Sequence, residues 1–492
     1  MRGLRTPVSD LRKSIFTEVA KIAYEADSAN LNDAVEAVPY TVCPGDVPTY
    51  RESIYRERAI AAERVRLAMG KLPSDLHYEK TDNTQIVHVM KSACEGCPID
   101  RVTVTNNCQN CLAQKCMKAC RFGAIMHTPT GAYIDKTKCK NCGACVKACP
   151  YNAIVDIERP CIKACPVNAV DMDENDLAKI DEDKCINCGQ CVSKCPFGAI
   201  GAESMMTNVI NSIRNNPDHT YAMIAPAIEG QFGKATIPQL KQAITDLGFK
   251  DCYEVALGGD AVAWNEAEEL LENVEAGKKM TTSCCPAFYN MIMKHYPEVK
   301  DNVSTTVSPM IASAKAIKAK DPDAEVVFIG PCIAKKNEVV SRYMGEISAA
   351  MTFDELAAMF AVKNVDPETY EGVEQLATRY GKGFARSGGV SAAVLKVVEE
   401  KGIETKPSVK ICNGAAECKV ALQLLKLGRL KEDIIEGMAC EGGCVNGPMR
   451  QYELIDSKKV FDKNVNVENT EIINTCKENG YGELNIHIHN HN

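Results

Sequence analysis

The chain has 492 residues, 25% of them charged, and a formal net charge of −8. This length predicts two or three domains with a large core. A negative balance with no block of basic residues argues against nucleic acid and anionic membranes as partners. We find no apolar run typical of a secretory signal and no stretch of about 18 apolar residues, so we expect a cytoplasmic protein that does not cross a membrane.

Cysteine is the unusual residue of this chain, which contains 26 of them. Sixteen lie between Cys94 and Cys195. In a reducing cytoplasm, such a number favours metal binding over a disulfide scaffold.

Residues 1–90 contain only one cysteine and predict a mostly helical N-terminal region. Apolar residues recur at steps of three and four between 11 and 23, which indicates an amphipathic helix. The stretch 50–69, rich in Arg, Glu and Ala, predicts a second helix. Residues 86–90 predict a short strand that leads into the cysteine-rich segment.

Residues 91–205 predict an α+β, ferredoxin-like domain with several 4Fe-4S clusters. Two complete C-x2-C-x2-C-x3-C-P runs begin at Cys139 and Cys185. In bacterial ferredoxins the fourth cysteine of such a run binds the other cluster. Two incomplete copies begin at Cys108 and Cys161.

Exchanging the fourth cysteines between runs uses all sixteen residues in four groups. These are Cys108, Cys111, Cys116 with Cys149; Cys139, Cys142, Cys145 with Cys120; Cys185, Cys188, Cys191 with Cys165; and Cys94, Cys97, Cys161 with Cys195. The last group follows by exhaustion. Its alternative is a zinc site made by two C-x2-C pairs, Cys94, Cys97, Cys108 and Cys111.

Residues 206–492 predict an α/β catalytic domain with a C-terminal extension. Apolar runs at 221–228 and 326–331 predict buried strands, and helical patterns lie between them at 237–247 and 263–274. Sites in such folds usually lie at strand ends.

Three further motifs carry cysteines that fit none of the ferredoxin runs. They are Thr282-Ser-Cys-Cys-Pro-Ala, Gly330-Pro-Cys-Ile-Ala-Lys-Lys and Met438-Ala-Cys-Glu-Gly-Gly-Cys. On a helix, Cys440 and Cys444 would share one face, because they are four residues apart. The cation of Lys335 follows Cys332 by three residues.

These motifs, with the cysteine-rich segment, resemble the signatures of the iron-only FeFe-hydrogenases over residues 91–450, in particular a divergent, monomeric, clostridial-type branch. The resemblance implies a ferredoxin-type hydrogenase that catalyses 2 H+ + 2 e− ⇌ H2. It implies an H-cluster, which is a 4Fe-4S cubane bridged to a two-iron unit with carbonyl and cyanide ligands, and about four accessory 4Fe-4S clusters. The implied partners are a ferredoxin or similar low-potential carrier and the H-cluster maturation proteins.

The resemblance also implies roles for single residues. The cubane ligands would be Cys285, Cys332, Cys440 and Cys444, the last of which would bridge to the two irons. Cys284 would pass protons to and from the two-iron unit. A thiol with an ordinary pKa near 8.5 suits that role better than an amine.

Four other residues would surround the two-iron unit. Lys335 would hydrogen-bond one cyanide, and Met438 would pack against the unit. Pro226 and Ala227 would lie against a second cyanide.

The family's proton route would run from Cys284 through Glu266, Ser304 and Glu269 to the surface. Glu266 and Glu269 share a helix face at i, i+3. The alternative is that both glutamates are ordinary surface residues.

Several positions depart from the family pattern while every ligand is kept. The departures are Ala287 and Phe288 for Gly-Trp, Gly330 for methionine, Ala227 for serine, Met310 for glutamine, and Asn273 for a basic residue. They bear on rate, overpotential and preferred direction.

Two other functions fit part of the pattern: a hydrogenase-like iron–sulfur assembly protein and a hydrogen sensor. Cys284, Lys335 and Met438 would serve only a two-iron site and so favour the enzyme. The remaining cysteines are expected to be ordinary buried or surface thiols: Cys43, Cys252, Cys412, Cys418 and Cys476. As an alternative, Cys412 and Cys418 lie in a Gly-Ala loop and could approach the cofactor. His487, His489 and His491 alternate in a polar tail, which we expect to be a frayed end. The alternative is a strand face that binds a metal.

Overall fold

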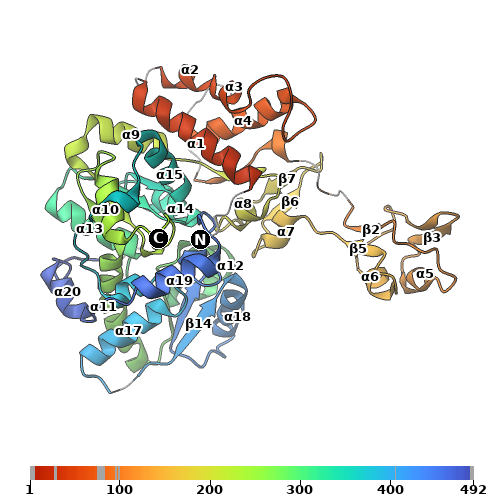
Figure 1. The fold of residues 1–492 in the computed structure, drawn as a ribbon. Coiled ribbons are helices and arrows are strands. Elements are labelled where there is room, and N and C mark those ends of the chain that lie inside the picture. Colours follow the sequence, from red (N-terminus) through yellow and green to blue (C-terminus); the bar gives the residue numbers. More distant parts are fainter. Residues whose placement is uncertain are drawn as a thin grey trace.

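The computed structural model describes residues 6–26, 30–74, 84–94, 97, 100–404 and 406–487. A large body of helices surrounds parallel sheets, and the cysteine-rich segment extends from it as an arm (Figure 1). Among the described residues, no helix has the length and apolar character needed to cross a membrane.

Two parallel sheets form the centre of the body. The first has the order β10 (Cys252–Glu254), β9 (Thr220–Ile224), β12 (Glu325–Ile329) and β13 (Ala349–Met351). The second has the order β11 (Met280–Thr281), β15 (Ile434–Met438) and β14 (Val409–Asn413). The predicted α/β fold is confirmed. The strand expected over 221–228 is shorter, because Pro226–Ile228 form a 3-10 turn.

Helices cover these sheets. They are α9 (Met206–Asn215), α10 (Ile237–Thr245), α11 (Val255–Glu275), α12 (Pro286–His295), α13 (Pro309–Lys320), α14 (Ile333–Arg342), α15 (Phe353–Lys363), α16 (Arg379–Gly383), α17 (Gly389–Glu400), α18 (Ala415–Lys426), α19 (Leu454–Asn464) and α20 (Ile472–Glu478). Helix α11 packs against α13, α16, α17 and α20, so its first half is buried on all sides. A polar side chain on the buried face of that helix, such as Glu266, is therefore held inside the protein.

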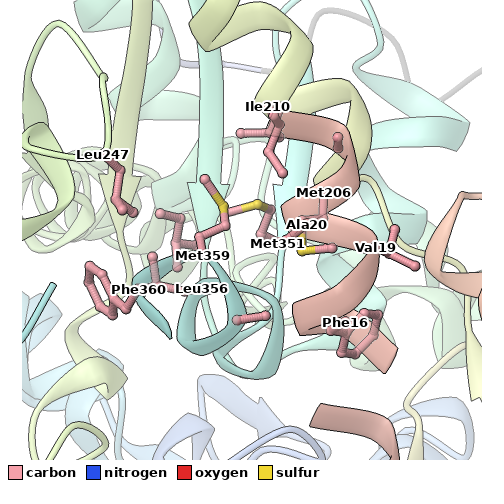
Figure 2. Packing of buried hydrophobic residues seen from close by; sticks show 14 of the residues in the cluster. Phe16, Val19, Ala20, Met206, Ile210, Leu247, Met351, Leu356, Met359 and Phe360 are labelled. Carbon is pink, nitrogen blue, oxygen red and sulfur yellow. The ribbon is translucent and has the colours of Figure 1, made fainter. Parts of the chain in front are cut away.

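The N-terminal region is helical, as predicted. It consists of α1 (Pro7–Glu25), α2 (Leu31–Val35), α3 (Val38–Val42) and α4 (Ile54–Ala68). Figure 2 shows Phe16, Val19 and Ala20 of α1 in one apolar core with Met206 and Ile210 of α9. Burying these side chains removes apolar surface from water and fixes the N-terminal helices on the body.

The inner half of the arm lies against the body. It contains β1 (Val87–Val89), α7 (Pro160–Ala164), β6 (Val170–Met172), β7 (Ala178–Ile180), α8 (Gln190–Lys194) and β8 (Ile200–Ala202). The strand predicted at 86–90 is β1, and it pairs with β8 from the other end of the segment.

The outer half of the arm has the same plan and lies farthest from the body (Figure 1). It contains β2 (Val102–Val104), α5 (Lys115–Ala119), β3 (Ile125–Thr128), β4 (Gly131–Ile134), α6 (Ala144–Ala148) and β5 (Ile154–Asp156). In each half, two five-residue helices pack together beside antiparallel strand pairs. The ferredoxin-like prediction is confirmed.

Candidate active site

One cavity in the body is lined by the segments that follow four parallel strands, β9, β11, β12 and β15. It brings together all nine residues predicted to surround the cofactor: Pro226, Ala227, Cys284, Cys285, Cys332, Lys335, Met438, Cys440 and Cys444. Parallel strands present their carboxyl ends at one edge, which explains why motifs far apart in sequence meet here.

Two of the cysteines stand where helices begin. Cys285 is the N-cap of α12, with Pro286 at the first helical position, and Cys332 is the N-cap of α14. The unpaired N–H groups and the positive dipole ends of both helices are therefore beside the thiols. This arrangement favours a negatively charged group in the cavity.

The helix considered for residues 440–444 is not formed. Cys440 lies at a bend, and Cys444 begins a 3-10 helix, Cys444–Asn446. Between them Gly443 has φ 90°, and a Cβ there would lie 2.5 Å from the backbone oxygen of Ala385. Glycine is needed because the chain turns against neighbouring backbone.

The four motif cysteines influence one another electrostatically. Burial and the nearby Cys285 thiol raise the pKa of Cys332 to about 11. Burial and the nearby Cys332 thiol also raise the pKa of Cys440 and of Cys444. The Lys335 cation lowers the pKa of Cys332 and Cys444 in part, but burial and the neighbouring thiols outweigh it. Thiols gathered in this way are expected where they bind the positively charged core of a metal cluster.

The spacing of these thiols bears on which metal group fits. Among the described residues, no three His, Cys, Asp or Glu side chains converge closely enough to hold a single metal ion. A zinc ion draws four sulfurs to about 2.3 Å from one centre. Thiols that instead line a cavity fit a multi-iron cluster better.

Lys335 points its ammonium group toward two partners in the buried site. Its Nζ donates to Ser308 Oγ over 2.8 Å and to Glu338 Oε2 over 2.7 Å. Sequence reasoning assigned no role to either partner, although Glu338 lies three residues further on the same helix face. Both contacts fix the orientation of the cation.

Two departures from the family pattern have a steric explanation. A Cβ at Gly330 would lie 2.7 Å from the ring of Phe328, which lines the cavity. A Cβ at Gly437 would lie 2.3 Å from the ring of Phe288. Each aromatic ring therefore requires its glycine, and a methionine at position 330 would displace Phe328.

The polar residues predicted as a relay follow one another away from the cavity. The backbone N–H of Ser283 donates to Glu266 Oε1 over 3.3 Å, while Glu266 Oε2 is buried without a hydrogen-bond partner. Ser304 Oγ donates to Glu269 Oε2 over 2.7 Å. Glu266 is fully buried, so the surface alternative is wrong for it, whereas Glu269 is partly exposed.

The pKa shifts agree with this order. Burial, and next the charge of Glu269, raise the pKa of Glu266 to about 8. Burial, and next Glu266, raise the pKa of the Cys284 thiol well above its usual value. The pKa value near 8.5 that holds for an unperturbed thiol therefore does not apply to the buried Cys284.

The outer end of this series meets the C-terminal tail. The Thr305 N–H donates to Glu269, and Thr305 Oγ1 lies 3.1 Å from His487 Nδ1. The prediction of a frayed end was wrong at His487, because its backbone also bridges to Thr306. His489 and His491 lie outside the described residues.

The cysteines of the outer arm fall into the predicted groups. One cavity is lined by Cys108, Cys111, Cys116 and Cys149, and a second by Cys120, Cys139, Cys142 and Cys145. Each group contains three thiols of one run and one thiol of the other. The alternative zinc site, which needed Cys108 and Cys111 beside Cys94 and Cys97, loses two of its ligands to the first of these cavities.

The inner arm gathers the other two groups. Burial, and next the Cys195 thiol, raise the pKa of Cys161 to about 11, with smaller contributions from Cys97 and Cys94. The pKa of Cys191 is raised by burial and then by the thiols of its own group, Cys188, Cys185 and Cys165. Cys161 adds to the latter shift, so the two groups are neighbours.

The inner arm also touches the active-site cavity. Cys188 lines that cavity, and Gln190 Nε2 lies 3.8 Å from Cys440 Sγ. Gly189, with φ 74°, lets the loop approach α14, where a Cβ would lie 2.5 Å from Ile333 Cδ1. Thiols of the arm and of the body are thus brought together without intervening structure.

Metal analysis tests the grouping in the arm. Four groups of four thiols predict about sixteen iron atoms in the arm and matching sulfide. Replacing Cys108 by serine should remove about four iron atoms, while Cys43→Ser, outside the arm, should remove none. Stoichiometric zinc in the purified chain would contradict the grouping.

Fold and site together define an iron–sulfur oxidoreductase in which a ferredoxin-like arm adjoins a buried, thiol-lined cavity. The family model for the iron-only hydrogenase large subunit, C-terminal domain, matches residues 218–448. A 4Fe-4S binding domain matches residues 132–155, and an LdpA Fe-S cluster-binding domain matches residues 155–206.

Curated relatives extend this likeness beyond one domain. Iron hydrogenase 1 of Clostridium pasteurianum is 30% identical over 390 residues, which cover 66% of this chain and 67% of that protein. The periplasmic Fe hydrogenase large subunit of Nitratidesulfovibrio vulgaris is 30% identical over 387 residues, covering 65% and 89%. A solved apo FeFe-hydrogenase from Chlamydomonas reinhardtii has a TM-score of 0.45 and 20% identity, covering 56% of this chain and 94% of that one. The chain belongs to the iron-only hydrogenase family.

Proposed function

We propose that this chain is an FeFe-hydrogenase that catalyses 2 H+ + 2 e− ⇌ H2. The observation that carries the proposal is the single cavity lined by the four motif cysteines together with Cys284, Lys335 and Met438, beside Cys188 of the arm. Cys284, Lys335 and Met438 would serve only a two-iron site, which an iron–sulfur assembly protein lacks. Membership of the iron-only hydrogenase family supports the same reaction.

The cavity fits an H-cluster by the chemistry of its donors. The ligands would be Cys285, Cys332, Cys440 and Cys444, the last as the bridge to the two irons. When bound, this group supplies the metal chemistry that makes and splits H2. It is installed by maturation proteins, which we propose as partners of the chain.

At the cavity, the protein's own side chains would orient the cofactor and exclude water from it. The ammonium of Lys335 is held by Ser308 and Glu338, and it would donate a hydrogen bond to a cyanide of the two-iron unit. Met438, Pro226 and Ala227 are buried apolar residues that keep water from the same space. A fixed donor in a dry site acts more strongly than one in water.

Protons would move along the buried polar series. Cys284 would exchange a proton with Glu266, whose unpartnered Oε2 is free to receive it. Glu266 would then give a proton to the Ser304 hydroxyl, which would release its own proton to Glu269 along their 2.7 Å hydrogen bond. Glu269 is partly exposed and would exchange protons with the surface.

His487 would assist this outer exchange through Thr305, because position 273 lacks the family's basic residue. Asn273 instead donates to Met280 Sδ over 3.6 Å. Histidine is the side chain suited to proton exchange near neutral pH. We expect His487→Ala to slow H2 evolution by about threefold to tenfold, less than the 10² of a direct acid–base residue. Added imidazole should restore the rate, and His295→Ala should change nothing; a rate insensitive to His487 would remove it from the route.

Electrons would travel through the arm, from the outer half to the inner half and then to the cavity beside Cys188. The carrier at the outer end would be a ferredoxin or a similar low-potential protein. We propose three functional units. Residues 1–90 form a helical supporting region, residues 91–205 the electron-transfer domain and residues 206–492 the catalytic domain.

The test of this function is turnover by the matured enzyme. With reduced methyl viologen it should evolve H2, and with H2 it should reduce oxidised viologen. Infrared spectra should contain the carbonyl and cyanide bands of the two-iron unit. A chain that binds the full complement of iron yet lacks both activity and these bands would defeat the proposal.

A further inference from the structure

The outer half of the arm differs in charge from the rest of the chain. Residues 100–157 contain eight Lys or Arg and three Asp, which gives +5, while the whole chain carries −8. The positive charge is therefore concentrated on the part that lies farthest from the catalytic body (Figure 1).

Only three of these eight cations are paired. Arg101 pairs with Asp156, Lys136 with Asp100 and Lys138 with Asp135. The other five are exposed and have no ion pair with any residue that the structure describes: Lys115, Lys118, Arg121, Lys140 and Lys147. Their charges face solvent rather than stabilising the fold.

Exposed apolar side chains lie among these cations. Leu112 is 98% exposed, Phe122 47% and Tyr151 52%. Tyr151 and Lys115 line the cavity of the Cys108 group, and Phe122 and Lys140 line that of the Cys139 group. Each cluster cavity of the outer arm therefore has an exposed aromatic ring and an exposed cation at its wall.

We propose that segments 112–122 and 140–151 form the docking surface for an acidic electron-carrier protein of the ferredoxin type. A positive surface steers a negative partner and orients it, while apolar residues at the centre exclude water. The partner's cluster would then come to rest beside the two outer cavities. This inference rests on the proposed function for the use of the electrons, although not for the binding itself.

The alternative explanation for these exposed cations is that they offset the negative charge of thiolate-bound clusters. That role predicts loss of iron when the cations are reversed. Docking predicts instead that the clusters stay intact while only the protein partner is affected. Measurements of iron and of two different electron donors separate the two roles.

The repeat provides a matched experiment. Lys118 on α5, Lys147 on α6 and Lys163 on α7 each stand two residues before the fourth cysteine of their run, and all three are exposed. Lys163 belongs to the inner half of the arm. The test variant is Lys118→Glu with Lys147→Glu, and the control variant is Lys163→Glu.

The probe is a purified acidic 4Fe-4S ferredoxin. In the holoenzyme, the double variant should raise the KM for reduced ferredoxin by about tenfold or more and weaken its dependence on salt. Its rate with methyl viologen, its iron content and its kcat should stay unchanged. Lys163→Glu should leave the KM within about twofold of the parent.

Three outcomes would overturn the docking surface: an unchanged ferredoxin KM, an equal effect of Lys163→Glu, or loss of cluster iron in the double variant. Calorimetric titration with ferredoxin at low salt gives a readout that needs no turnover. If the parent enzyme were inactive with viologen, the proposed function would be contradicted. The docking surface would still be supported if the parent bound ferredoxin and the double variant did not.

Discussion

Replacement of Cys284 by alanine should reduce H2 turnover by about 10³-fold or more, while the cofactor stays bound. The thiol lines the cavity and adjoins Glu266, but it is not among the four proposed cluster ligands. Loss of a positioned proton donor commonly costs 10² to 10⁴ in rate. The rate with reduced viologen and the infrared bands of the same sample should separate these two effects.

Cys476→Ala is a suitable control, because Cys476 is also a buried thiol but lies on α20, away from the cavity. The Cys476→Ala variant should retain both the infrared bands of the cofactor and the rate of H2 evolution with reduced viologen. If Cys284→Ala kept substantial turnover, another group would have to carry the proton. If the bands vanished, Cys284 would be needed for cofactor binding instead.

Glu266→Gln should lower turnover by about 10²-fold or more, because the amide can neither release nor accept the transferred proton. The same change should stabilise the fold at alkaline pH. The amide keeps an acceptor for the Ser283 N–H and carries no charge into a fully buried site. A gain in stability with a loss of activity is the behaviour expected of a strained functional group.

The sign of the pH effect follows from the raised pKa. In the unfolded chain this carboxyl group ionises near its ordinary value of 4.5, whereas in the folded chain its pKa is raised to about 8. The unfolded state therefore gains relative stability as pH rises from about 4.5 to 8. The accumulated cost is on the order of a few kcal/mol.

Thermal unfolding of parent and Glu266→Gln at pH 5.5 and pH 8 measures this cost. The melting temperature of Glu266→Gln should exceed that of the parent by a larger margin at pH 8 than at pH 5.5. Glu268→Gln on the same helix is the control, since Glu268 is exposed and pairs with Lys401. Equal pH dependence of parent and Glu266→Gln would mean that the buried carboxyl is not neutral in the fold.

Local spacing in the sequence determined much of this protein. The C-x2-C-x2-C-x3-C runs specify the ferredoxin-like halves, since each short helix and its loop are encoded within a few residues. The cysteine motifs after β11, β12 and β15 could be located because a strand, a turn and a helix cap are all local features. Glu266 and Glu269 could be paired because they lie on one helix.

Only the tertiary structure decided which distant residues meet. Burial of Glu266 depends on the packing of α13, α16, α17 and α20 around α11, which no local pattern encodes. The exclusion of a side chain at Gly330 depends on the ring of Phe328, and His487 reaches Thr305 across 182 positions of the chain. Spacing thus determined which side chains can bind clusters. Long-range packing determined their burial, their partners and the outward direction of the polar route.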